Sequence, residues 1–366
     1  MAESQAPPEN KALTSIRGVA ALWVVLHHWV GDLGVFADEI RYGMRSVDIF
    51  FVLSGLILAE VYYRLDFRSV GGFFLKRFFR IYPAYWFSMA LLGFVALFPH
   101  RMTWTGFISL WNWNYVGLLM LLQPYIKITA GANPVAWSLG IELTCYLAFP
   151  LAMMAFRNLK PYLLIPLLIF AAWFEVYYVL VVCTAETSGM AALGRGLGGF
   201  GFGMLVLCFA RTWNPGKTAV HVVEGIATVG ILYAVFNPYP NHAPFWAAVI
   251  MYCLYFNVGV LSRILETPVL YWLGRISFSM YLIHFPLICA MKSWGPVKYF
   301  RWTNNYVGMR SVGVSLLILF LLSTLSLHLM EEPGRRIPAH LAAMMRRFKK
   351  GAQTQSASAA RVVGDQ

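Results

Sequence analysis

The chain has 366 residues, of which 59% are hydrophobic and 12% are charged, and its mean hydropathy is +0.62. Roughly a quarter of the residues of a soluble domain are charged, so this composition excludes a soluble enzyme and indicates a protein that crosses a membrane repeatedly. The formal net charge of +13 is a topology signal rather than a sign of nucleic-acid binding, because the basic residues concentrate between apolar segments.

Apolar runs long enough to cross a bilayer recur along the whole chain. We predict ten transmembrane helices, at 12–30, 46–63, 80–98, 134–156, 161–183, 189–210, 217–237, 242–262, 270–291 and 309–330. Most Lys and Arg residues lie in the loops that are cytoplasmic if the N-terminus is cytoplasmic, so both termini are expected there. The prediction is an all-α polytopic protein of the bacterial inner membrane. It has a polar segment at 1–10, a membrane domain at 11–340 and a basic, disordered tail at 341–366.

The first predicted helix carries two costly side chains. Arg17 and His28 are eleven positions apart, which on a helix is about 16 Å, half the thickness of the hydrocarbon layer. Ionisable groups at such depth are mostly functional, so the pair suggests chemistry inside the membrane. Neighbouring helical residues point about 100° apart, and by this argument His27 and His28 are equally good candidates.

Two carboxylates are predicted at a depth similar to that of His28. Asp48 lies near the outer end of the second helix, and Glu142 lies about two turns below the outer end of the fourth. An imidazole with a carboxylate can act as a base and its orienting partner, which would remove a proton from a hydroxyl. The alternative is a structural polar cluster that joins helices.

A basic and aromatic segment follows the second helix at the predicted cytoplasmic face. Arg77 and Arg80 are three residues apart, so on a helix they share a face and could bind phosphate oxygens, with Lys76 beside them. Basic residues at a cytoplasmic helix end are also what topology alone predicts.

The predicted outer loop at 99–133 is rich in aromatic residues but too interrupted for a further transmembrane helix. We expect an interfacial or re-entrant element there, with Trp104, Trp111, Trp113 and Tyr115 at headgroup level. Aromatic faces stack on sugar rings, although a lipid-linked acceptor would suit these residues as well.

Two later segments carry charged or titratable residues. Residues 194–199 match the G-x-G-x-x-G pattern, but no strand precedes them, so the glycines predict close helix packing, and Arg195 needs a partner or water. The helix at 270–291 places Arg275 near the inner face and Tyr281 and His284 deeper, where a structural histidine is the default interpretation. The pair Glu331 and Glu332 before Pro333 predicts a helix end with counter-charges for the basic loops.

Together these segments resemble the membrane acyltransferase-3 family. The resemblance covers about Lys11 to Pro338 and rests on six segments in family order. They are Leu13–Leu22 with His28, Ser46–Leu56, Arg77-Phe-Phe-Arg80-Ile-Tyr-Pro, Trp137-Ser138-Leu-Gly-Ile-Glu142, Tyr281-Leu-Ile-His-Phe-Pro, and Glu332-Pro.

The resemblance implies an O-acyltransferase that moves an acyl group, with acetyl expected, from cytoplasmic acyl-coenzyme A to a hydroxyl of a carbohydrate, glycolipid or small molecule. It favours His28 over His27 as the base and implies that Arg17, Lys76, Arg77 and Arg80 bind the coenzyme. Trp137 and Ser138 are further site candidates from the matching segment. No metal is expected. The alternatives are an acyl-imidazole on His28 and, in a different class, a transporter that uses the buried charges as a relay.

Overall fold

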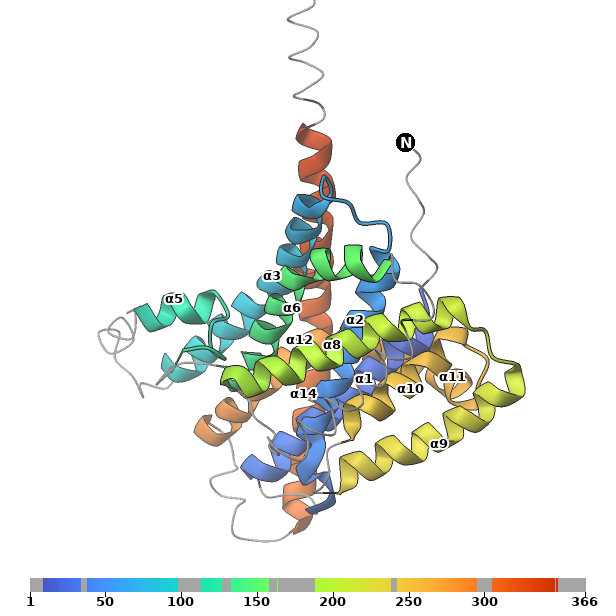
Figure 1. Ribbon diagram of the computed structural model, residues 1–366. Helices are drawn as coiled ribbons and strands as arrows, with labels where there is room; N and C mark the ends of the chain where they lie inside the picture. Colours follow the sequence, from blue (N-terminus) through green and yellow to red (C-terminus); the bar gives the residue numbers. More distant parts are fainter. Residues whose placement is uncertain are drawn as a thin grey trace, which may run out of the picture.

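The computed structural model is helical throughout the part of the chain that it describes, as predicted (Figure 1). The described residues are 9–33, 38–97, 113–126, 133–157, 163, 188–237, 242–294, 305–345 and 347. In chain order the elements are α1 (Lys11–Leu33), the 3₁₀ turn η1 (Asp38–Arg45), α2 (Ser46–Val61), α3 (Val70–Leu97), α5 (Trp113–Leu119), η2 (Pro134–Ala136), α6 (Trp137–Arg157), α8 (Gly189–Thr212), α9 (Lys217–Phe236), α10 (Ala243–Phe256), α11 (Val260–Leu265), α12 (Pro268–Trp294), α14 (Asn305–Ser326) and the π-helical turn η5 (Leu327–Glu331).

Six helical segments of the described chain are long and apolar enough to cross a bilayer. They are Val70–Leu97, Pro134–Arg157, Gly189–Thr212, Lys217–Phe236, Pro268–Lys292 and Val312–Met345. The other predicted spans also coincide with helices, namely α1, α2 and α10, except 161–183, which lies outside the described residues apart from position 163. A multi-pass membrane protein is therefore established, whereas ten spans and cytoplasmic termini stay predictions.

Two predicted boundaries are wrong. The span at 242–262 is interrupted, because α10 ends at Phe256 and Asn257 adopts a left-handed conformation (φ 53°) before α11 begins. The helix that was predicted to stop near Pro333 instead passes through the π-helical turn and continues to Met345. It thus extends into the segment predicted as a disordered tail at 341–366, most of which lies outside the described residues.

The predicted outer element is represented by α5, which at seven residues is too short to cross a bilayer. Figure 1 shows this helix projecting from one side of the bundle. Trp104 and Trp111 lie outside the described residues, so their expected interfacial position stays a prediction.

Close backbone contacts at glycines hold the two central pairs of helices together. Gly18 of α1 and Gly274 of α12 lie against each other's helix, and a Cβ at either position would overlap the opposite backbone. Gly203 of α8 likewise approaches the Val52 carbonyl of α2. Small residues permit such close packing between helices in membranes. These contacts confirm the predicted glycine-rich packing face of α8.

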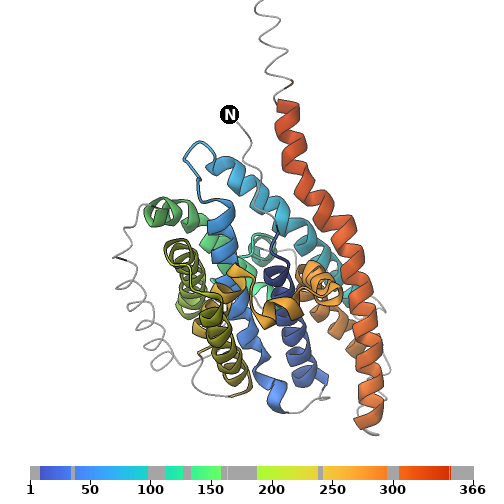
Figure 2. The same ribbon diagram turned by 90° about the vertical axis from the view of Figure 1, so that its right-hand side faces the viewer.

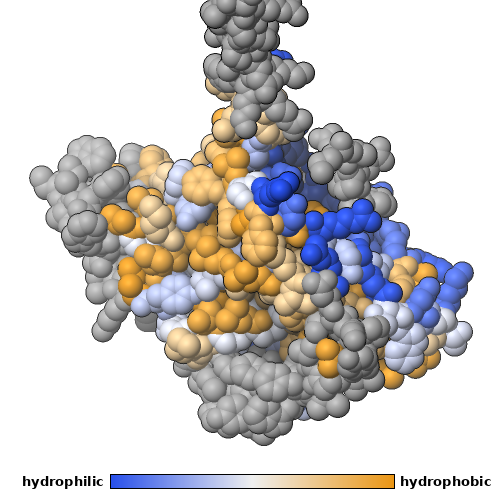
Figure 3. Space-filling view, turned by 45° about the horizontal axis from the view of Figure 1, so that its top comes forward, coloured by the Kyte–Doolittle hydropathy of each residue, from blue (hydrophilic) through white to orange (hydrophobic). Residues whose placement is uncertain are grey.

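The outer surface is consistent with a lipid environment. Large apolar side chains stand exposed on several helices, among them Leu147, Val229 and Leu317. Figure 3 shows apolar residues covering much of one face beside a hydrophilic region, and Figure 2 shows the long C-terminal helix running along one edge of the bundle. In water such extensive apolar exposure would favour aggregation, whereas in a bilayer it is solvated by acyl chains.

Candidate active site

The pairing of α1 with α12 gives Arg17 and His28 of α1 partners on one helix. The Arg17 Nε donates a hydrogen bond to the Ser277 hydroxyl (2.8 Å), and its Nη2 donates to the Gly274 carbonyl (3.1 Å). Near the other end of α1, the His28 ring lies against His284 of α12, with ring centroids 5.0 Å apart. The close approach of Gly18 and Gly274 makes both contacts possible.

The hydrogen bonds of His28 indicate which of its nitrogens is basic. Its Nδ1 lies 2.9 Å from the Val24 carbonyl, one turn earlier, and 3.3 Å from Nε2 of His284. A carbonyl only accepts hydrogen bonds, so Nδ1 is the nitrogen that carries the proton, and in the neutral ring Nε2 is then the proton acceptor. His27 stacks edge-on against His28, with ring centroids 5.1 Å apart.

Three residues that the sequence singled out connect His28 to the interior of the bundle. His284 is completely buried, and its ring lies 5.9 Å from that of Tyr281. The Tyr281 hydroxyl donates to the Val135 carbonyl (2.8 Å) and lies 2.8 Å from the Ser138 hydroxyl. His284 of α12 therefore lies between His28 of α1 and Tyr281, whose hydroxyl reaches Ser138 of α6.

Glu142 is held on the other side of this row. Its Oε1 accepts hydrogen bonds from the Ser54 hydroxyl (2.9 Å) and from the Tyr146 hydroxyl (2.6 Å). The hydrogen bonds of the Glu142 carboxylate thus come from α2 and α6, and the imidazole of His284 lies against His28. That Glu142 orients His28 stays a prediction.

A cavity of about 80 Å³ brings Glu142 and Tyr281 together with two arginines. Its polar lining consists of Arg17, Ser54, Arg80, Ser138, Glu142, Tyr146 and Tyr281, and its apolar lining consists of Val47, Phe50, Phe51, Ile81, Leu139 and Phe278. Two cations and one carboxylate therefore face a space that is otherwise enclosed by aromatic and aliphatic side chains.

The three basic residues of α3 occupy different environments. Arg80 lines the cavity, with its guanidinium over the Phe278 ring (5.3 Å). Arg77 lies over the ring of Tyr146 (5.9 Å) and donates weakly to the Tyr62 hydroxyl (3.4 Å). Lys76 is exposed. The structure thus places Arg17 and Arg80 in the cavity lining, whereas Arg77 is outside the lining and contacts Tyr146, which is part of it.

Asp48 forms an ion pair with Arg195 and so is the partner that this arginine was expected to need. The Arg195 Nε lies 2.6 Å from Oδ1 and its Nη2 lies 3.2 Å from Oδ2, and both side chains are almost completely buried. The Arg195 guanidinium also lies over the ring of Trp137, 5.4 Å from its centroid. Through these contacts Asp48 and Trp137 link α2, α6 and α8, while a catalytic function of Asp48 stays a prediction.

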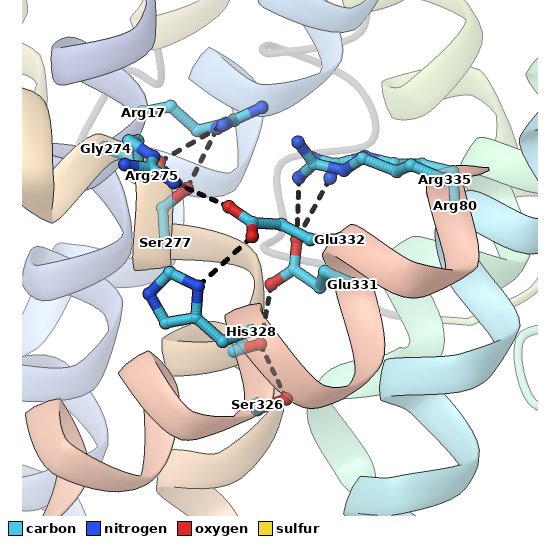
Figure 4. A network of polar contacts seen from close by, with 11 residues as sticks. Arg17, Arg80, Gly274, Arg275, Ser277, Ser326, His328, Glu331, Glu332 and Arg335 are labelled. Carbon is cyan, nitrogen blue, oxygen red and sulfur yellow. Dashed lines mark hydrogen bonds and ion pairs between the residues drawn. The ribbon is translucent and has the colours of Figure 1, made fainter.

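A second polar network lies behind Arg80, where α3, α12 and the π-helical turn meet (Figure 4). Glu331 pairs with Arg80 (3.0 Å) and Arg335 (2.8 Å), while Glu332 pairs with Arg275 (2.6 Å) and His328 (3.1 Å). The predicted counter-charges are confirmed, and the finding that the sequence missed is the complete burial of Glu331. Ser54 and Tyr146 were also missed as site residues, although Ser54 lies in a segment that the resemblance already covered.

Comparisons with known proteins place the chain among acyltransferases. A sequence profile described as an acyltransferase domain matches residues 10–328. "Protein 2 in picA locus" of Rhizobium radiobacter is 36% identical over 38% of this chain and 81% of its own length. Acyltransferase MdmB of Streptomyces mycarofaciens is 34% identical over 38% of each chain.

A peptidoglycan O-acetyltransferase of Listeria monocytogenes is 23% identical over 89% of this chain and 56% of its own length. The chain thus spans little more than half of that relative and a smaller share of the Streptomyces protein. No solved structure matches the chain.

Proposed function

The chain belongs to the acyltransferase-3 family, and we propose that it is an integral membrane O-acetyltransferase of the bacterial inner membrane. Its donor is cytoplasmic acetyl-coenzyme A, and its acceptor is a hydroxyl of a carbohydrate or glycoconjugate at or across the membrane. The name of the Listeria relative supports the glycan acceptor. The observation that carries the proposal is the cavity lined by Arg17 and Arg80, whose lining residue Tyr281 lies one turn from His284, the residue against His28.

Charge supports the assignment of the cavity to the donor. Arg17 hydrogen-bonds to a hydroxyl and a carbonyl, both neutral, and the cavity lining holds two arginines but one carboxylate, Glu142, so the lining keeps a net positive charge. A partly desolvated cation with neutral partners favours an anionic ligand, and phosphate oxygens bind guanidinium groups in a bidentate manner. Arg80 would contribute a second such group, while Arg77 and Lys76 extend the basic surface toward the exposed end of α3.

The chemical step follows from the tautomer of His28. Nε2 of His28 takes the proton of the acceptor hydroxyl while the hydroxyl oxygen attacks the thioester carbonyl. The resulting imidazolium then gives this proton to the departing thiolate of coenzyme A. The Val24 carbonyl and His284 orient the ring through Nδ1. A fixed hydrogen bond at the second nitrogen keeps the first one correctly placed for proton transfer.

Glu142 contributes from within the donor cavity. Its negative charge partly balances Arg17 and Arg80 and favours the developing imidazolium, while Ser54 and Tyr146 prevent it from rotating. Asp48 acts only indirectly, because it fixes α8 against α2 through Arg195.

The proposal is tested by measuring release of free coenzyme A from acetyl-coenzyme A by the purified protein. Addition of a glycan acceptor should accelerate release, and His28→Ala should abolish that acceleration. A transporter or acyl-group conduit would move substrate without acceptor-dependent release. Absence of release with every glycan acceptor tried, by protein that still binds the donor, would therefore favour the transporter.

A further inference from the structure

The carboxylate of Glu331 is completely buried and bonded on both oxygens. Oε1 accepts a hydrogen bond from the Ser279 hydroxyl (2.6 Å), while Oε2 accepts from Arg80 (3.0 Å) and from Arg335 (2.8 Å). A carboxylate removed from solvent is costly unless it is paired and hydrogen-bonded, and here every partner comes from a different turn or helix. Its orientation is therefore fixed by α12 as well as by the cations.

Local backbone geometry places this carboxylate. Glu331 is the last residue of a five-residue π-helical turn in a helix that is otherwise regular. A π turn adds one residue to a helical turn and so rotates everything after it by about 100°, and such turns occur frequently at functional sites. Glu332, the next residue, is directed to Arg275 and His328 and is partly exposed, with 27% of its side chain accessible.

We propose that Glu331 is a positioning residue that holds Arg80 in the orientation required by the acyl donor. The inference rests on the proposed function of the cavity. One nitrogen of Arg80 is bonded to Glu331, and the same side chain lines the cavity. A guanidinium has five N–H donors in a rigid plane, so fixing one edge directs the remaining donors toward a phosphate.

The charges around Glu331 allow this function without repelling an anionic donor. Arg80 and Arg335 share its single negative charge, and Arg17 nearby is bonded to neutral groups. The cluster as a whole therefore stays positive. Because Ser279 and Arg335 hold the carboxylate, it cannot follow Arg80, and the guanidinium is ordered before the donor arrives.

The direct test is the donor KM of Glu331→Gln. We expect KM to rise about two- to tenfold, the scale of ordering one long side chain, with kcat changed by less than about twofold. The matched control is Glu332→Gln, which alters the adjacent carboxylate without touching a residue of the cavity and should leave KM unchanged. A lower KM in Glu331→Gln would show that Glu331 competes with the donor for Arg80, and an unchanged KM would show that it does not position Arg80; either overturns the proposal.

The same change in an Arg80→Ala background separates positioning from general destabilisation. If Glu331 acts through Arg80, Glu331→Gln should have almost no effect on KM there, whereas a structural function predicts the same fold-change in both backgrounds. Should Glu331→Gln fail to fold, Ser279→Ala removes one bond to the carboxylate and should raise KM in the same direction. An unchanged KM in folded Ser279→Ala would then count against the proposal.

Titration of each folded variant with a non-hydrolysable acetyl-coenzyme A analogue distinguishes this inference from the function on which it rests. If the unmodified protein does not bind the analogue, the proposed donor is wrong. If the unmodified protein binds it and Glu331→Gln binds equally well, the positioning function alone is refuted.

Discussion

The ion pair of Asp48 and Arg195 leads to a prediction that separates a structural carboxylate from a catalytic one. Asp48→Asn keeps the shape of the side chain but removes its charge, leaving the Arg195 guanidinium buried beside a neutral amide. Breaking a buried pair by removing one partner costs about 3–5 kcal/mol, because the remaining charge stays desolvated. Only 3% of the Arg195 side chain and 1% of the Asp48 side chain are exposed, so water cannot solvate the remaining charge. We therefore expect Asp48→Asn to lower the free energy of unfolding by an amount within that range.

The measurement is the free energy of unfolding in detergent or lipid, together with the acetyl-transfer rate of the folded fraction. Replacing both partners by apolar residues of similar size, Asp48→Leu with Arg195→Met, should recover most of the stability lost in Asp48→Asn, since no charge is left unpaired. The folded double variant should retain activity. If Asp48→Asn is as stable as the unmodified protein but inactive, the structural interpretation of Asp48 is refuted and a catalytic one is required.

Three further predictions address the site and the topology. His28→Ala should abolish transfer in a folded protein, whereas His27→Phe should retain much of it, and equal losses would refute the choice between the two histidines. Arg80→Ala should weaken donor binding by roughly 1.5–3 kcal/mol in calorimetric titration, with partial rescue by Lys, and full rescue by Lys would indicate a topology signal only. Cysteines placed at Gly216 and Asn237, the flanks of α9, should be labelled from the cytoplasm and from the outside respectively, and labelling of both from one side would overturn the predicted orientation.

The sequence predicted the helical fold and most helix positions because hydrophobic segments of membrane length leave few alternatives. It also predicted the packing function of the α8 glycines and the need of Arg195 for a partner. It could not identify Asp48 as that partner, because depth in the membrane does not specify which helices are neighbours. That Glu142 contacts Ser54 depends in the same way on the packing of α2 against α6, whereas its contact with Tyr146, four residues later, is made within α6.

Two local features were also beyond sequence reasoning. The π-helical turn at Leu327–Glu331 lets the last long helix continue past a Glu-Glu-Pro segment that is typical of a helix end. The buried carboxylate of Glu331, at the end of this turn, is bound by Arg80 of α3 and Ser279 of α12, which are distant in the sequence, as well as by Arg335 one turn later. The left-handed Asn257 ends α10 inside a continuous apolar run, and the short helix α11 that follows packs against α1.

The central claim is that this protein transfers an acetyl group from coenzyme A to a glycan hydroxyl with His28 as the base. The most direct measurement uses the protein in liposomes, isotopically labelled acetyl-coenzyme A and a glycan acceptor, with mass spectrometry of the recovered glycan. The account predicts labelled acetyl ester with the unmodified protein and none with folded His28→Ala. Labelled ester at equal levels with both proteins would contradict the assigned base, and absence of labelled glycan with donor-binding unmodified protein would contradict the proposed reaction.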